Sequence, residues 1–193
     1  PLSALRLYLK RNGLEPGKDV VFMSVAESQQ GRMNALMRGA VSGTVLAPPF
    51  SNIAKQAGYR EPADLRKTDI EYAANSIAAN VPYIKTHPQL VENFLKGYIE
   101  SLYFFRSQKE RTIAGIMKFL KVSHRARAEE GYDYYYDLMP VMPYPSDAGI
   151  RSVLQNLAAR QPKAATANPE DFYDISFLKK IEASGFAKGF RAK

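Results

Sequence analysis

The sequence predicts an α/β fold with a parallel sheet, followed by a helix-rich C-terminal half. Up to about residue 58, segments with helical periodicity alternate with short apolar runs, and this order is typical of parallel strands joined by crossover helices. From about residue 80 onward, apolar residues recur at three- and four-residue steps, which predicts long amphipathic helices. The chain has 193 residues, of which 46% are apolar and 24% charged. This composition is that of a globular protein with a packed core.

The first predicted helix begins near Ser3, a residue type that caps helix N-termini. Leu5 and Leu9 share one helical face, and Gly13 provides a C-terminal stop. The apolar run at 19–23 shows no alternation of apolar and polar residues. It therefore predicts a parallel strand that is covered on both faces.

A second helix is predicted at 28–38, where Gly39 can adopt the left-handed conformation that ends a helix. A strand at 43–47 follows and stops at Pro48 and Pro49, because proline cannot donate to a ladder. Ligands bind at the carboxyl ends of strands in open α/β sheets, so this turn is a candidate wall of a binding crevice. The alternative is an ordinary strand-to-helix loop with Pro49 at the start of a helix near 50–57.

A third strand is expected within 69–79, and the remainder of the chain reads as helical. Predicted helix starts lie at Ser123, Ser146 and Asn168, and the last helix stops at Gly185. The residues expected on buried helix faces are Val91, Phe94, Leu95, Tyr98, Ile99, Leu102, Ile113, Ile116, Met117, Leu120, Ile150, Val153, Leu154, Leu157, Phe177, Leu178 and Ile181.

The charge and composition exclude several classes of function. The formal net charge is +8, but the basic residues are spread over several helical segments and interspersed with acidic ones, so we expect solvated helix surfaces and no nucleic-acid partner. The chain contains no cysteine, which excludes disulfides, thiolate metal sites and a cysteine nucleophile. No apolar run approaches the roughly 18 residues of a membrane span.

Motifs that would indicate catalysis or metal binding are scarce. His87 and His124 are 37 positions apart and lack metal-ligand spacing, so both are expected at the surface. Glu129, Asp133 and Asp137 can share one helical face, which we expect to meet water rather than a metal. The sequence also has no glycine-rich phosphate loop. We therefore expect no catalytic residues, no metal site and no cofactor.

The order of several longer segments resembles a known protein family. These segments are GLEPGKDVVFMSV, GRMNALMRGAVSGTVLAPPF, THPQLVENFLKGYIESL, PYPSDAGIRSVLQNLA and PEDFYDISFLKKIEASGF. Together they resemble the nitrate/sulfonate/taurine-type (NitT/TauT) substrate-binding proteins of ABC transporters and cover nearly the whole chain. The resemblance implies a periplasmic-binding-protein-like fold of type II with an incomplete first lobe. Residues 1–68 would form an α/β unit, most of the second lobe, and residues 69–193 a crossing strand and a helical return region belonging to the first lobe.

The resemblance also implies a function. The chain would be the solute-binding component of an ABC importer, without catalysis, that delivers a small, anionic organic solute to a membrane permease. It would act in the bacterial periplasm or another extracytoplasmic space. Carried over by position, the cleft wall would consist of Ser3, Val25, Ala26, Glu27, Ala47, Pro48 and Pro49. An anion would suit the helix N-terminus at Ser3, whereas the carboxylate of Glu27 would repel it unless it faces solvent.

The sequence departs from the family pattern at two places. It starts at the helix that follows the opening strand of the second lobe, so the resemblance implies an N-terminally truncated chain, in which exposed faces around Phe94 and Tyr98 favour self-association over normal solute binding. Val41-Ser42-Gly43 replaces a common Val-Asp-Ala, which weakens any transfer of nitrate or sulfonate specificity. Two alternatives remain: an enzyme like the thiamin-pyrimidine-precursor synthases, disfavoured by the lack of cysteine, and the ligand-sensing domain of a transcription regulator.

Overall fold

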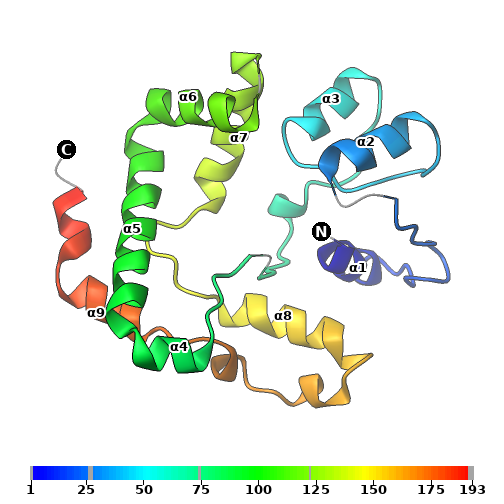
Figure 1. Cartoon of the computed structure of the whole chain (residues 1–193). Coiled ribbons are helices and arrows are strands. Elements are labelled where there is room, and N and C mark those ends of the chain that lie inside the picture. Colours follow the sequence, from blue (N-terminus) through cyan, green and yellow to red (C-terminus); the bar gives the residue numbers. More distant parts are fainter. Residues whose placement is uncertain (1, 26–27, 74, 122, 191–193) are drawn as a thin grey trace. The chain divides into compact units, whose positions relative to one another are not determined.

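Helices build the fold of this chain, and the α/β class that the sequence predicted is wrong. The computed structural model describes residues 2–25, 28–73, 75–121 and 123–190. Within these ranges there is no sheet, and the only β-type pairing is an isolated bridge between Pro16 and Val20. The helical elements, with η for 3₁₀-helices, are α1 (Leu2–Arg11), α2 (Gln29–Met37), α3 (Phe50–Gln56), η1 (Leu65–Lys67), α4 (Val81–Thr86), α5 (Pro88–Ser107), α6 (Lys109–Leu120), α7 (Arg125–Leu138), α8 (Asp147–Ala158), η2 (Pro162–Ala165), η3 (Pro169–Phe172), α9 (Ser176–Ala183) and η4 (Phe186–Phe190) (Figure 1).

The segment predicted as the second strand is held by side chains of α2 instead of by a neighbouring strand. The Gln29 side-chain Oε1 accepts the Ala47 N–H at 2.6 Å, and Arg32 Nε donates to the Val45 carbonyl at 3.2 Å. These two bonds satisfy backbone groups that a sheet ladder would otherwise pair. The segment therefore stays extended without becoming a strand.

The other two predicted strands fail for lack of partners as well. In the segment at 19–23, Val21 is 80% exposed and Met23 is 63% exposed, so the apolar run is not covered on both faces. The segment at 69–79 is irregular where it is described, and its Ala73 N–H donates to the carbonyl of Gly149 in α8 at 3.3 Å.

Helix boundaries, in contrast, follow the local signals of the sequence. The Ser28 hydroxyl accepts the Gly31 N–H at 3.0 Å and caps α2 as expected from its residue type. Gly39 and Gly58 follow α2 and α3 with positive φ values of 69° and 87°, a conformation that costs glycine little. The later predicted α-helices form, with α5 as the longest at 20 residues, except that the start predicted at Asn168 gives only the 3₁₀-helix η3.

The chain divides into two units, of which the first comprises residues 1–74 and 148–167. Its core lies between α2 and α3, where Met33, Leu36 and Ala54 are buried. The Tyr59 hydroxyl donates to the Leu36 carbonyl at 3.2 Å and ties the end of α3 to α2. This unit buries few large side chains.

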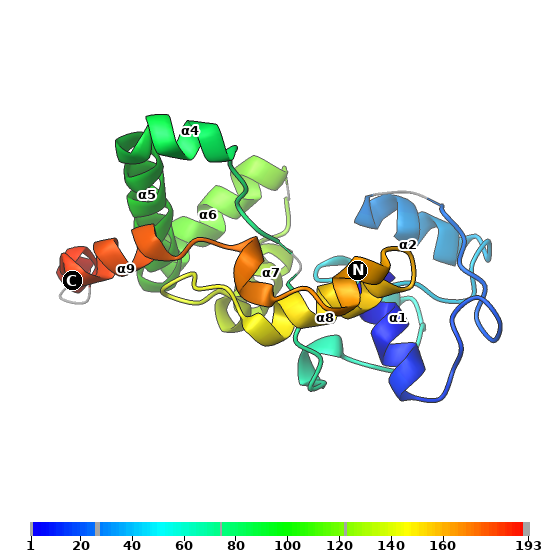
Figure 2. The ribbon, with the colours of Figure 1, turned by 90° about the horizontal axis from the view of Figure 1, so that it is seen from below.

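The second unit comprises residues 75–147 and 168–193 and is organised around α5. Helix α9 and η4 lie beside α5 in both views (Figures 1 and 2). Ile99 and Ile181 are completely buried between them, together with Tyr103 and Leu178. Beyond the α5–α9 contact, α6 packs on α7 around the buried side chain of Ile113.

A buried carboxylate also links α5 to α9. Glu92 accepts hydrogen bonds from Lys180 of α9 at 2.6 Å and from Lys96 of α5 at 2.7 Å. The hydrogen bond from Lys180 is the main reason that the pKa of Glu92 is lowered from 4.5. Because a buried carboxylate is stable only when paired, these lysines keep Glu92 charged in the folded unit.

Candidate functional site

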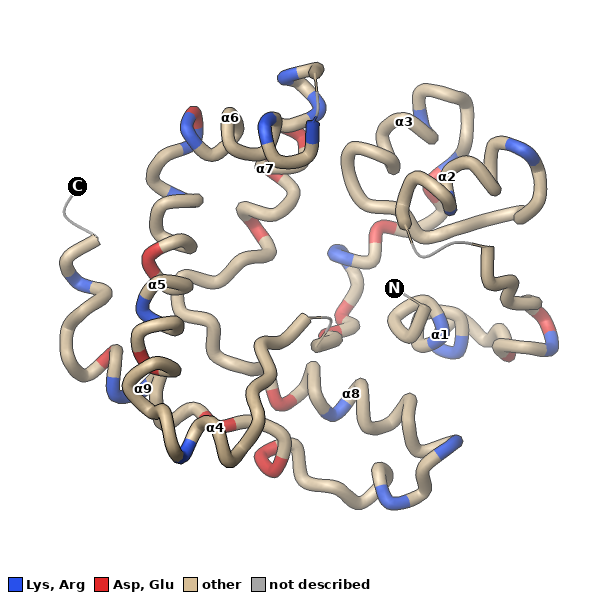
Figure 3. The backbone as a smooth tube through the Cα atoms, in the orientation of Figure 1, with Lys and Arg blue, Asp and Glu red and all other residues tan. Residues whose placement is uncertain are grey.

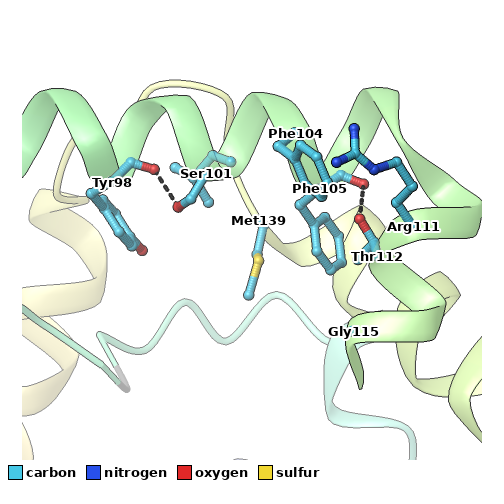
Figure 4. A pocket seen from close by; sticks show the side chains of 9 residues that line it. Tyr98, Ser101, Phe104, Phe105, Arg111, Thr112, Gly115 and Met139 are labelled. Atoms are coloured by element: carbon cyan, nitrogen blue, oxygen red, sulfur yellow. Dashed lines mark hydrogen bonds between the residues drawn. The ribbon is translucent and has the colours of Figure 1, made fainter. Parts of the chain in front are cut away.

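The candidate site is a groove of about 370 Å³ in the second unit, within the size range of small-molecule sites. One wall comes from α5 and the other from α6, while Met139 closes the groove from the segment after α7 (Figure 4). Its lining is mostly apolar and aromatic. The lining residues are Tyr98, Ser101, Leu102, Phe104, Phe105, Arg111, Thr112, Gly115 and Met139.

Among the lining residues just named, Arg111 is the one with a charged side chain. It lies over the ring of Phe104 at 5.0 Å from the ring centroid, a cation–π contact that leaves its N–H edges available. Among the described residues, no carboxylate pairs with Arg111, whereas Arg125 of the next helix is bound by both Glu110 and Glu129. The groove therefore combines apolar walls with an uncompensated cation.

The hydroxyls of the lining are turned toward the backbone. Ser101 Oγ donates to the Tyr98 carbonyl at 2.6 Å, and Thr112 Oγ1 donates to the Phe105 carbonyl at 3.5 Å (Figure 4). Their hydrogens are thus engaged by backbone carbonyls of α5. Arg111 is consequently the group on this lining best suited to recognise a charged ligand, because guanidinium can bind carboxylate or sulfonate oxygens in pairs.

Contacts behind the lining fix the walls of the groove. Arg106 Nη1 donates to the carbonyls of Tyr136 at 2.9 Å and Met139 at 2.8 Å, which holds the segment after α7 against α5. Phe105 stacks on Tyr132 with ring centroids 4.8 Å apart. Burial is the main cause of the raised pKa of Tyr132, so this ring stays neutral where it supports the wall.

Gly115 leaves space in the groove wall of α6. A Cβ built at this position would meet no heavy atom within 4 Å. Its φ is not in the left-handed region, so an alanine would fit the helical backbone. A side chain at position 115 can therefore fill the groove without displacing its walls.

The structure separates the site residues that the sequence predicted. Ser3 lies inside the first turn of α1 and not at its N-cap as expected, and its carbonyl accepts from Asn156 Nδ2 at 3.2 Å. Ala47 is joined to α2 through Gln29, and Pro48–Pro49 is a cis peptide bond directly before α3. Helix α1 packs closely on neither α2 nor α3 in the described part of the unit. Ala26 and Glu27 lie outside the described residues.

The two histidines lie at the surface, as expected. His87 and His124 are exposed, and His87 stacks on Tyr83 with a centroid distance of 4.5 Å. Asp133 forms an ion pair with Lys109 at 3.0 Å. Within the part of the chain that the structure describes, no cluster of His, Asp or Glu residues is arranged to hold a metal ion.

A second hollow of about 460 Å³ lies at the start of α9 and is more polar. It is lined by Glu170, Tyr173, Asp174, Ile175, Ser176 and Lys179. The Tyr173 hydroxyl donates to Asp147 Oδ1 at 2.6 Å, which raises the pKa of Tyr173 to about 12. The carboxylates of Glu170 and Asp174 line this hollow together with Lys179, so it suits an anion less well than the groove at Arg111 does.

Sequence reasoning missed the groove because its residues were assigned to other roles. Tyr98 and Leu102 were expected in a buried helix face, and Arg111 was counted among the solvated charges of the helix surfaces. The available signal was the spacing of Tyr98, Leu102 and Phe105, which places them along one face of α5. That face is only partly covered, because the chain turns at Gln108 and α6 leaves in a new direction.

Comparisons with known proteins identify no family for this chain. No protein-family model, no curated protein and no solved structure matches it. None of the described helices combines the length and the apolar composition that a membrane span requires.

Proposed function

We propose that the chain is the solute-binding component of a bacterial ABC importer, acts outside the cytoplasm and captures a small anionic organic solute without catalysis. The resemblance of several sequence segments, in their order, to the nitrate/sulfonate/taurine-type proteins supports the transport role. The observation that carries the ligand class is the guanidinium of Arg111, which has no carboxylate partner among the described residues and borders an apolar groove. Because the described residues form no sheet whose strand ends could build a cleft, we assign the ligand to this groove.

The chemistry of the groove defines the solute more closely. Phe104 and Phe105 provide flat apolar walls, and Arg111 can bind two oxygens of a carboxylate or sulfonate. A groove of about 370 Å³ holds a ligand the size of one substituted ring or a short branched chain. We therefore expect an anion with an apolar body, such as an aromatic or branched carboxylate or sulfonate.

Calorimetric titration with benzenesulfonate, benzoate, benzamide and benzylamine tests the ligand class. The anions should bind more tightly than the neutral and cationic analogues. Arg111→Gln should weaken benzenesulfonate binding at least tenfold, because it removes a charge-assisted hydrogen-bond pair worth roughly 1.5–3 kcal/mol. Lys118→Gln is the matched control, since it removes the same charge from the same helix but does not line the groove. Equal effects of the two substitutions would refute a specific role of Arg111.

The transport role needs a separate experiment. For an anion that binds through Arg111, deletion of the gene should lower its uptake by the source cells. Restoration of the wild-type gene should restore uptake, and restoration with Arg111→Gln should not. Unchanged uptake after deletion would refute the importer assignment while leaving anion binding intact.

A further inference from the structure

The end of α6 carries exposed apolar side chains that the proposed solute binding does not use. Phe119 is 85% exposed and Leu120 is 58% exposed. Both precede Lys121, which ends α6 in the left-handed conformation with φ 54°. A phenylalanine and a leucine side by side in water are costly, so this end of the helix is suited to contact an apolar phase.

Basic residues flank these apolar side chains in the chain. Lys118 and Lys121 directly border Phe119 and Leu120, and Arg127 follows in the first turn of α7. All three cations are exposed, and none forms an ion pair with a described residue. Figure 3 shows Lys and Arg positions gathered where α6 ends and α7 begins.

The nearby acidic groups do not neutralise these cations. Glu110 and Glu129 are both bound to Arg125, and Asp133 is bound to Lys109. Glu130 lies one turn beyond Arg127 on α7, and Glu129, which is nearer in sequence, is already bound to Arg125. The end of α6 itself carries Lys118 and Lys121 without a carboxylate between residues 111 and 128.

Helix α6, which carries these exposed side chains, is packed firmly on α7. Ile113 is completely buried against Ala128 and Tyr132 of α7, with Ile116 and Met117 packed at the edge of the same cluster. The ion pair between Arg125 and Glu110 joins the two helices at the surface. Exposed side chains on a packed helix lose little backbone freedom on binding, which favours docking.

We propose that this basic apolar tip, formed by Lys118, Phe119, Leu120 and Lys121, docks on an anionic membrane surface. Phe119 and Leu120 enter the boundary between headgroups and acyl chains, and the lysines contact anionic headgroups. The positive charge of the tip, next to its apolar side chains, favours an anionic membrane over other binding partners. A second copy of the chain would bring like charges together, and a nucleic acid would neutralise the lysines but leave Leu120 in water. Membrane docking by the tip is independent of solute binding at Arg111.

Co-sedimentation with vesicles tests the proposal on the full chain. The chain should bind vesicles of phosphatidylcholine with 30% phosphatidylserine and bind pure phosphatidylcholine at least tenfold more weakly. Lys118→Gln/Lys121→Gln should weaken binding about 25-fold, since each basic residue near an anionic surface contributes about fivefold. Lys10→Gln/Lys18→Gln is the matched control, because both lysines are exposed and distant in sequence, and it should change binding less than threefold.

The apolar contribution is tested with the tip residues themselves. Phe119→Ser/Leu120→Ser should weaken vesicle binding at least tenfold, whereas Phe94→Ser, at a 57% exposed position of α5, should leave it unchanged. Because the chain has no tryptophan, Phe119→Trp supplies a single reporter. Its emission should shift to the blue on anionic vesicles, and that of Phe94→Trp should not.

Several results would overturn the proposal. Equal binding to neutral vesicles, or no effect of Phe119→Ser/Leu120→Ser, would exclude insertion of the tip. Tighter binding of a single-stranded oligonucleotide than of anionic vesicles, lost in Lys118→Gln/Lys121→Gln, would identify a nucleic-acid surface. A dimer in light scattering that becomes a monomer in Phe119→Ser/Leu120→Ser would assign the tip to self-association. Unchanged circular dichroism of the variants shows that the fold is retained in each comparison.

Discussion

Replacement of Ile181 by alanine should destabilise the second unit strongly. Ile181 is completely buried between α9 and α5, next to Ile99 and Tyr103. The substitution removes three carbon atoms, whose burial is worth about 0.8 kcal/mol each, and leaves a cavity that adds to the cost. We therefore expect the free energy of unfolding to fall by about 3 kcal/mol.

Urea denaturation measures this loss. With a slope of about 2 kcal/mol per molar urea, a loss of ~3 kcal/mol lowers the midpoint by about 1.5 M. Phe172→Ala is the control, since it removes a larger side chain that is 59% exposed and should change the free energy of unfolding by less than about 0.5 kcal/mol. Equal midpoint shifts for the two variants, or a loss below about 1 kcal/mol for Ile181→Ala, would show that α9 does not pack on α5 as described.

Three further predictions concern single side chains. Gly115→Ala should raise the free energy of unfolding by up to about 1 kcal/mol, because alanine favours the helix and its Cβ meets open space; destabilisation in urea would contradict the open groove wall. Tyr173 should titrate with a pKa of about 12, because its hydroxyl donates to Asp147. Since its folded pKa is raised, its contribution to stability is complete below pH 10 and is lost between about pH 10 and 12, a loss that should be absent in Tyr173→Phe. Glu92 has a lowered folded pKa, so its contribution is present above pH 4.5 and is lost as the pH falls below that value; Glu92→Gln should remove this acid-side dependence, and thermal melts at pH 3–7 measure it.

The helices were predictable from the sequence because their determinants are local. The Ser28 cap of α2 and the glycine stop at Gly39 depend on residues within one turn of the helix end. The face of α5 that carries Ile99 is visible as a three- and four-residue repeat, since every backbone hydrogen bond of a helix lies within the helix. Ser3 shows the usual uncertainty of one or two residues at helix ends.

The strands could not be predicted reliably because a strand depends on a distant partner. The run at 19–23 has the composition of a buried strand, but its Val21 remains exposed and no neighbouring strand pairs with it in the described chain. At 43–47 the backbone found its partners in the side chains of Gln29 and Arg32, a competition that the strand pattern itself does not reveal. The groove at Arg111 was hidden for the same reason, since it depends on the direction in which α6 leaves α5.

The side-chain bonds from α2 to the segment at 43–47 also affect how this protein resists aggregation. Thr44, Val45 and Leu46 are a β-prone, uncharged run, the kind of sequence that recruits identical segments of other molecules into cross-β ladders. In an extended segment, the Val45 carbonyl and the Ala47 N–H point to the same side, and Arg32 and Gln29 already bind these two groups. The helix thus occupies one edge of the run and blocks its templated growth along that side, as gatekeeper residues do in other folds.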